Sequence, residues 1–427
     1  MKNRLFLMIV TTIFAAVVVS CGGDDVAETP AGSIEVKKDA PKTPEVKPVK
    51  PSVPGRALLV TQSRFAPNED GKYTVPDAAV MMVLSFDGKK WKVDTIEDKE
   101  SNVFHKALQY GNEGILTIGA NEAMLKLWNK KDGKWEAKTL WHPTFGGKHN
   151  RLRDFEIADL DGDGAKDLAI ATHDQGVVAV AWQRDGKWKF DEIDRQADMF
   201  VHEIEIGDLD GNGKMEIYST PSQPNTSSGE GQGGGVLRYE WTGEKFEKSQ
   251  VVHYDQRHIK EILVADMDGD GKGELYAALE AQMGKDGRIE APVEIRRFDW
   301  DGAKFASTKV VELDDRFCRF LVAGDIDGDG ASELIAAAFS SGVWVIDKKG
   351  NEHGKTSIDT NSGGFEHAAY LADMDGNGKL ELYVANDMGG ALNRYVYEKG
   401  EYKRTVINKR LVPGQAMVWN ITVADIK

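Results

Sequence analysis

The sequence predicts an all-β protein, a seven-bladed β-propeller built from four-stranded blades. Five copies of one aspartate-rich motif recur at intervals of 48 to 59 residues. Short runs of alternating apolar and polar residues follow each copy, which is the pattern of half-buried strands. Hairpin signals such as Asp185-Gly186 end the repeats. Repeats of this length that contain four strands each are typical of propeller blades.

The first 20 residues have the features of a bacterial lipoprotein signal peptide. Lys2 and Arg4 precede an apolar stretch at residues 5–19, and Val18-Val19-Ser20-Cys21 resembles a lipobox. We therefore expect cleavage before Cys21 and lipid attachment to its sulfur. An ordinary signal peptide or an uncleaved anchor is the alternative. Cys21 is followed by Gly22 rather than Asp, which favours the outer membrane of a bacterial cell envelope.

Residues 21–55 then form a tether, because this segment is rich in Pro, Lys and Glu and has almost no aromatic residues. The folded region is expected to cover residues 56–427. Lipid would be the only link to the membrane, since no second apolar stretch is long enough to span a bilayer.

The repeat that begins at Asp159 shows the expected strand order. Strands are predicted over residues 155–160, 168–172, 176–183 and 188–194. The last hairpin of the repeat occurs seven times along the chain. Residues 56–97 lack a first strand, and residues 417–427 form a lone first strand, so the two chain ends are expected to complete one blade. Closure of this kind leaves no open sheet edge. Six or eight blades would follow if one degenerate repeat has been miscounted.

The aspartate motif has the oxygen spacing of a calcium loop. Asp159, Asp161, Asp163, the carbonyl of Ala165 and Asp167 supply positions 1, 3, 5, 7 and 9. Gly164 at position 6 permits the sharp turn. Position 12, which holds a glutamate in an EF-hand, is here Ile170 inside a strand. The motif therefore predicts a strand–loop–strand calcium site.

The five loops resemble the FG-GAP or VCBS repeats of integrin-α-like propellers, over residues 105–427. This resemblance implies about five structural calcium sites. Their ligands would be Asp159, Asp161, Asp163 and Asp167; Asp208, Asp210, Asn212 and Glu216; Asp266, Asp268, Asp270 and Glu274; Asp325, Asp327, Asp329 and Glu333; and Asp373, Asp375, Asn377 and Glu381. The second blade has Gly111-Asn112-Glu113-Gly114 in place of the loop, so no calcium is expected there.

The charge distribution supports a metal and argues against nucleic acid. The chain has 69 Asp and Glu against 54 Lys and Arg, a net charge of −15. The five loops hold 18 of these acidic residues, so the rest of the chain is close to neutral. The acidity is local to the loops, which would repel themselves without cations. Phosphate binding needs clustered basic residues instead, so no nucleic-acid partner is expected.

A second pattern lies six residues before each first aspartate, at the expected start of the innermost strands. These positions hold Arg153, His202, Lys260, Arg319 and His367, and alignment adds His105 and Trp419. Equivalent strand positions in a closed propeller lie at equal depth, so we expect a ring at the channel mouth. Asp154, Glu203, Glu261 and Glu366 are near enough in sequence to compensate its charge. The ring could be internal salt bridges, an anion or sugar-acid site, or a catalytic or transition-metal site.

These features favour a binding module that holds an anionic or carbohydrate ligand, or an envelope protein partner, at the channel mouth. The first alternative is an enzyme, since some propellers with related calcium repeats are similar to sugar lyases and sugar dehydratases. In that case His202 or His367 would act as the general base, and Arg153 and Arg319 would hold a carboxylate. The second alternative is a structural scaffold of an envelope complex. The sequence alone does not decide whether the protein is an enzyme, and it favours the binding module over an enzyme.

Overall fold

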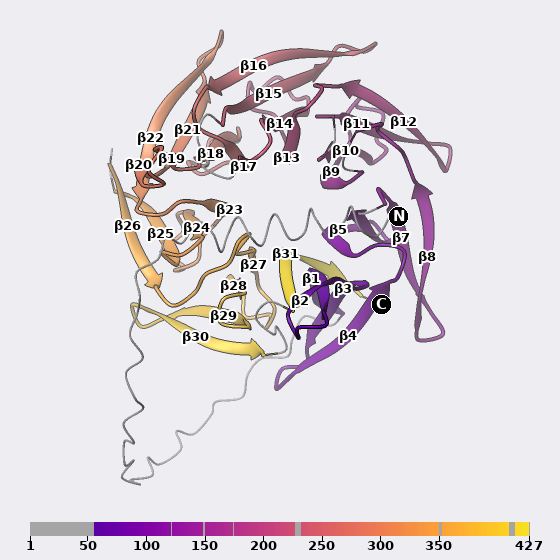
Figure 1. Cartoon of the computed structure of the whole chain (residues 1–427). Coiled ribbons are helices and arrows are strands. Elements are labelled where there is room, and N and C mark those ends of the chain that lie inside the picture. The colour runs from indigo at the N-terminus through magenta and orange to yellow at the C-terminus, as the bar shows by residue number, and fades with distance from the viewer. Residues whose placement is uncertain are drawn as a thin grey trace.

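The computed structural model describes residues 55–120, 122–147, 150–173, 175–226, 232–349, 352–409 and 415–426. Within these ranges every regular element is a β-strand. The strands surround a common centre in a propeller-like ring, as Figure 1 shows. The predicted signal peptide, the lipidated Cys21 and the tether up to residue 54 lie outside the described residues. No helix in the described part of the chain is long and apolar enough to cross a membrane.

The strands pair antiparallel in groups of four, which confirms an all-β fold of four-stranded sheets. In four groups the four strands follow one another along the chain with no further strand inserted. These groups are β9 (Leu152–Ala158), β10 (Asp167–Thr172), β11 (Val178–Arg184) and β12 (Lys187–Asp194); β13 (Phe200–Gly207), β14 (Glu216–Ser222), β15 (Gly234–Trp241) and β16 (Phe246–Tyr254); β23 (Cys318–Gly324), β24 (Glu333–Ala338), β25 (Val343–Lys349) and β26 (Glu352–Asp359); and β27 (Ala369–Ala372), β28 (Glu381–Asn386), β29 (Ala391–Glu398) and β30 (Glu401–Asn408).

One further group contains a small inserted hairpin. It consists of β17 (Ile259–Ala265), β18 (Glu274–Leu279), β21 (Val293–Trp300) and β22 (Phe305–Leu313). The hairpin between its second and third strands is formed by β19 (Gln282–Met283) and β20 (Ile289–Ala291). This insertion accounts for part of the longer spacing between the third and fourth aspartate motifs.

The chain ends meet in one sheet, as the sequence predicted. The C-terminal β31 (Ala416–Asp425) pairs antiparallel with β1 (Arg56–Pro67), from Arg56 opposite Asp425 to Arg64 opposite Ala416. The group continues with β3 (Ala79–Phe86) and β4 (Trp91–Asp98), and β2 (Tyr73–Pro76) also pairs with β1. A single pair, Ser63 with Val103, joins this group to β5 (Val103–Tyr110), β6 (Gly114–Ala120), β7 (Leu125–Lys131) and β8 (Lys134–Trp141).

The apolar core lies between neighbouring sheets. All six residues of β10 are buried, and successive side chains point to opposite faces of a strand. Leu168 and Ile170 therefore pack with Leu116 and Leu125 of the preceding sheet, whereas Ala169 and Ala171 belong to the cluster that contains Val201 of the following sheet. Each sheet is thus held from both sides, and the inner strands are fixed in register around the centre.

Candidate metal loops and channel-mouth site

The five aspartate loops share one hydrogen-bonded conformation. The Asp159 carboxylate accepts hydrogen bonds from the backbone N–H groups of Gly162 and Gly164, both at 2.8 Å. These glycines have φ angles of 79° and 90°, which L side chains rarely adopt. The position-6 glycine was predicted to make the turn, and the structure shows that the position-4 glycine is also needed. The position-6 N–H makes the same bond to the first aspartate in the other loops: Gly213 to Asp208, Gly271 to Asp266, Gly330 to Asp325 and Gly378 to Asp373.

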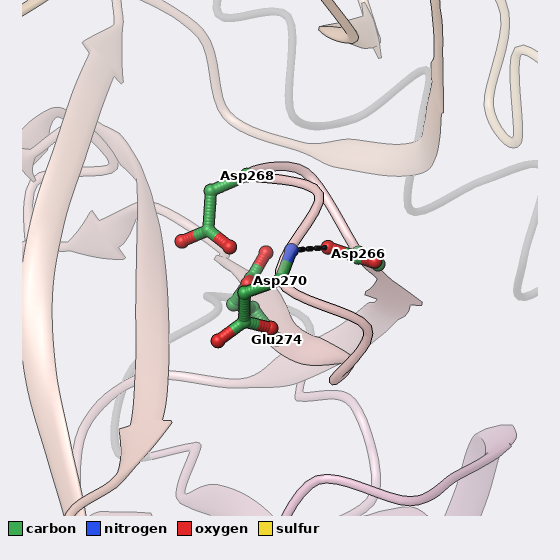
Figure 2. Close-up of side chains that lie close together, drawn as sticks. All are labelled: Asp266, Asp268, Asp270 and Glu274. Atoms are coloured by element: carbon green, nitrogen blue, oxygen red, sulfur yellow. Dashed lines mark hydrogen bonds between the residues drawn. The ribbon is translucent and has the colours of Figure 1, made fainter.

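Oxygen ligands converge in each loop. Atoms within 4.8 Å of one another are contributed by Asp159, Asp161 and Asp167; Asp208, Asp210 and Glu216; Asp266, Asp268, Asp270 and Glu274; Asp325, Asp327 and Glu333; and Asp373, Asp375 and Glu381. Figure 2 shows the third of these groups, with the Asp270 N–H directed at the Asp266 carboxylate at 3.1 Å. The other predicted position-5 ligands, Asp163, Asn212, Asp329 and Asn377, each accept a hydrogen bond from the backbone N–H two residues later, at 2.8 Å.

The acid at position 9 is the most buried member of each group, because it is the first residue of the following strand. Glu333 at the start of β24 is 4 % exposed and accepts the N–H of Ile326 at 3.0 Å. Burial, with the nearby Asp327, raises the pKa of Glu333 to about 7, and burial likewise raises the pKa of Glu274 to about 7. Carboxylates gathered and desolvated in this way fit a hard cation, which takes oxygen ligands.

The predicted ring residues all lie at the inner strands. His105, Arg153, His202, Lys260, Arg319 and His367 are buried, and Trp419 is half-buried. All but one lie within β5, β9, β13, β17, β23 and β31, and His367 comes two residues before β27. The structure links some of these side chains into one network and holds the others separately.

Two arginines of the ring share one carboxylate. Arg153 Nη2 lies 3.0 Å from Glu366 Oε2, and Arg319 Nη1 lies 3.3 Å from Glu366 Oε1. Arg319 Nε also contacts Glu280 Oε1 at 2.9 Å. All four side chains are at most 8 % exposed, so these are buried ion pairs. Part of the ring is therefore a salt-bridge network, which was one of the three interpretations of the sequence.

Lys260 extends this network through the second carboxylate. Its Nζ lies 3.5 Å from Glu280 Oε2 and 2.5 Å from Asn225 Oδ1. Burial and the neighbouring Arg319 lower the pKa of Lys260 to about 8, although Glu280 acts in the opposite direction. His258 Nδ1 lies 3.4 Å from the same carboxylate, and its Nε2 has no hydrogen-bond partner among the described residues. The sequence pattern did not single out His258, which precedes β17 and is not at the equivalent ring position.

His105 and Trp419 lie beside this network. The two rings meet edge to face with centroids 4.7 Å apart, and the Arg153 guanidinium lies 5.3 Å from the Trp419 ring centroid. His105 Nδ1 is 2.6 Å from the carbonyl oxygen of Leu152, so it carries the proton. Burial and Arg153 hold the pKa of His105 well below its usual range. The imidazole is therefore neutral and fixed.

The remaining two ring histidines differ in their surroundings. His202 contacts His173, whose Nε2 lies 3.1 Å from the His202 ring nitrogens. Burial and this second imidazole lower the pKa of His202, and His173 Nδ1 is left without a partner among the described residues. His367 is engaged at both nitrogens, by the carbonyl of Ala338 at 2.6 Å and by Ser362 Oγ at 2.8 Å. The carbonyl places the His367 proton on Nδ1, so Nε2 accepts a hydrogen bond from the Ser362 hydroxyl.

The carboxylates expected to balance the ring have mostly other partners. Glu366 does pair with it, but Asp154 pairs with Lys106 at 2.8 Å, and Glu261 accepts the backbone N–H of Leu321 at 2.6 Å. Glu203 forms no ion pair with any residue that the structure describes, and burial with Asp154 raises its pKa well above the usual range. Asp154 and Glu261 are buried and Glu203 is half-buried, and Glu280 takes their place in the ring. Glu280 directly follows β18, the second strand of its sheet.

The comparisons identify the repeats and the fold. A family model described as FG-GAP-like repeat matches residues 159–219 and 325–384. No curated protein sequence is significantly similar to this chain. A solved structure from Bacteroides fragilis named "putative 6-phosphogluconolactonase" is 12% identical, with a TM-score of 0.53, and the match covers 87% of this chain and 98% of that one. A protein of the same name from Bacteroides uniformis is 12% identical, with a TM-score of 0.53, over 86% and 99%. The chain therefore carries FG-GAP-like repeats in a β-rich, propeller-like fold.

Proposed function

We propose that this protein is a calcium-stabilised, seven-bladed propeller that binds a small anionic ligand at the channel mouth. The excess of positive charge at the channel mouth is the observation that supports this proposal. The network holds three cations, Arg153, Lys260 and Arg319, against two carboxylates, Glu280 and Glu366. Buried charge is costly unless it is paired. A ligand carboxylate or phosphate would supply the missing negative charge.

The histidines supply the neutral polar groups that such a ligand needs. His173 Nδ1 and His258 Nε2 are buried without hydrogen-bond partners among the described residues. Buried polar atoms are normally satisfied, so each unsatisfied one marks a place where a ligand atom or water would be stabilised. Trp419 offers an apolar ring face next to Arg153, which suits a sugar acid.

Calorimetric titration of the mature protein with D-galacturonate, 6-phosphogluconate and inorganic phosphate tests the site. We expect at least one to bind, and Lys260→Met to weaken it at least tenfold. Affinity should fall as the pH rises through about 8, because Lys260 then loses its proton. Lys403→Met is the matched control, since Lys403 pairs with Glu398 on the surface. If Lys260→Met binds the ligand as tightly as the wild type does, and circular dichroism shows an intact fold, the ligand does not bind at the channel mouth.

A second candidate function is enzymatic, and the His173–His202 contact favours it. Both imidazoles are kept neutral by burial, so either can accept a proton in a general-base step. Two structurally similar proteins carry the name of a sugar lactonase, so hydrolysis of 6-phosphogluconolactone is the first activity to assay. Turnover that disappears in His202→Gln and persists in His142→Gln, an exposed histidine, would establish the enzyme. If neither turnover nor ligand binding is found, the scaffold role is the one that stands.

The envelope location rests on the sequence of residues 1–21. We expect mass spectrometry of the protein from a bacterial host to find an acylated N-terminal Cys21. The Cys21→Ser variant should move from the membrane fraction to the soluble fraction. Membrane association that survives this change would indicate an uncleaved anchor instead.

A further inference from the structure

The five aspartate loops differ in whether an arginine of the same sheet already lies among their carboxylates. Arg238 Nη2 is 2.5 Å from Asp210 Oδ2 and 3.1 Å from Glu216 Oε1. Asp210 and Glu216 are the third and ninth positions of loop 208–216. A guanidinium therefore bridges the two acids that would also hold a cation between them.

The same bridge occurs in three other loops. Arg394 lies 2.6 Å from Asp375 and 2.5 Å from Glu381. Arg297 lies 3.0 Å from Asp268 and 3.5 Å from Glu274. Arg184 contacts both Asp161 and Asp167. In each case the guanidinium reaches positions 3 and 9 of its loop.

Loop 325–333 has no such arginine. In the described part of the chain, no Lys, Arg or His nitrogen forms an ion pair with Asp325, Asp327, Asp329 or Glu333. The side chain of Lys379, from the next loop, lies close to Gly328. The side chain of Lys272 lies close to Gly211 of loop 208–216 in the same way, so a neighbouring lysine does not distinguish loop 325–333 from the others.

Strand register accounts for three of the four arginines. Arg238, Arg297 and Arg394 each stand on the third strand of their sheet, directly opposite a tyrosine of the second strand: Tyr218, Tyr276 and Tyr383. The same register position in the sheet of loop 325–333 pairs Ile335 with Val345. An aliphatic pair stands where the other three sheets have the tyrosine–arginine pair, so this register position supplies no cation to loop 325–333. In the sheet of loop 159–167 the register pair is Ala169 with Val180, and Arg184 reaches the loop from the strand end.

An arginine in this position opposes a divalent cation. Like charges within a few ångströms repel each other, most strongly where water is excluded. The Arg238 side chain is only 7 % exposed, so it cannot withdraw into solvent without disturbing the sheet. Among the described residues, loop 325–333 has no arginine to repel calcium. Its acidic side chains repel one another instead, and a bound cation would relieve that repulsion.

We propose that loop 325–333 is the high-affinity calcium site of the protein, and that the arginine-bearing loops bind calcium at least tenfold more weakly. The inference rests on the proposed calcium binding. It makes loop 325–333 the site whose occupancy controls stability, while the internal guanidinium keeps the other four loops folded at low calcium.

Calcium titration by calorimetry, with the protein first stripped by a chelator, tests this. The wild type should show one tight site per chain and a weaker class. Asp327→Asn should abolish the tight site, whereas Asp375→Asn, the matched change in an arginine-bearing loop, should leave it in place. Arg394→Met should create a second tight site. Circular dichroism in excess calcium checks that each variant is folded.

The outcomes separate the two proposals. A tight site that survives in Asp327→Asn, or five equivalent sites in the wild type, would overturn the inference while leaving calcium binding intact. The absence of calcium binding in the folded wild type would overturn the calcium proposal itself. If Arg394→Met does not fold, Arg297→Met offers the same test in loop 266–274.

Discussion

Arg153 and Glu366 form a buried ion pair at 3.0 Å between parts of the chain that are 213 residues apart. Arg153 lies on β9 and Glu366 just before β27, in sheets that are not neighbours in the ring (Figure 1). Because Glu366 also receives Arg319, one carboxylate joins three inner segments across the centre. The central network therefore contributes to holding the ring closed as well as to any ligand site.

Removing the Glu366 carboxylate should destabilise the folded protein. The Glu366→Gln change leaves Arg153 without an ionic partner among the described residues. It also removes one of the two ionic partners of Arg319. Breaking a buried ion pair from one side costs about 3–5 kcal/mol, because the remaining charge stays desolvated. We expect the free energy of unfolding to fall by about that amount in urea denaturation at saturating calcium.

The control for this change is Glu398→Gln. Glu398 pairs with Lys403 at 2.9 Å, but both side chains are more than half exposed. Exposed pairs contribute about 0–1 kcal/mol, so this variant should denature almost like the wild type. Equal losses in the two variants would contradict a special role for Glu366.

Stability should depend on pH through His367. Burial lowers the pKa of this imidazole to about 4, against about 6.5 in an unfolded chain. The unfolded state therefore binds the proton first, so stability is lost as the pH falls from about 6.5 to about 4 and is steady above that range. The shift corresponds to about 3 kcal/mol. Urea denaturation across this range should show the loss.

His367→Asn should flatten that pH profile, whereas His142→Gln should not, because His142 is 45% exposed. Burial also lowers the pKa of His258 to about 4, so His258 contributes a slope of the same sign. A profile unchanged in His367→Asn would show that the pKa of this imidazole is the same in the folded and the unfolded chain.

Calcium binding at loop 325–333 should weaken in mild acid. Burial and the surrounding aspartates raise the pKa of Glu333 to about 7 in the absence of metal. A metal ligand must be deprotonated, so binding releases a proton below this pH. We expect the apparent affinity to fall about tenfold per pH unit below 7, as measured by titration in matched buffers. Binding that is independent of pH between 5 and 8 would show that Glu333 is not a ligand.

The sequence predicted the strands, the loops and the pairing of the chain ends because each depends on local spacing. Period-2 alternation and Gly164 at position 6 are visible in a single repeat. The sequence could not predict the partners of the ring, since Arg153 and Glu366 meet only when separate sheets close around the centre. Glu203 and Glu366 both neighbour a ring residue in the chain, yet only Glu366 forms an ion pair with the ring. The arginine bridges were missed for a related reason, because they follow from the register between strands two and three.

The β31–β1 pairing should decide whether the protein folds cooperatively. Deleting residues 416–427 removes the strand that pairs with β1 along most of its length, together with the buried Val418 and Ile421. The deletion also exposes the edge of β1, which invites pairing with another chain. We expect loss of the single cooperative transition in thermal denaturation and soluble aggregates by size-exclusion chromatography. Ile421→Asp, at 1 % exposure, should reproduce the defect, and Lys403→Glu on the exposed face of β30 should not. A monomer that unfolds cooperatively without residues 416–427 would mean that the ring does not need its closing strand.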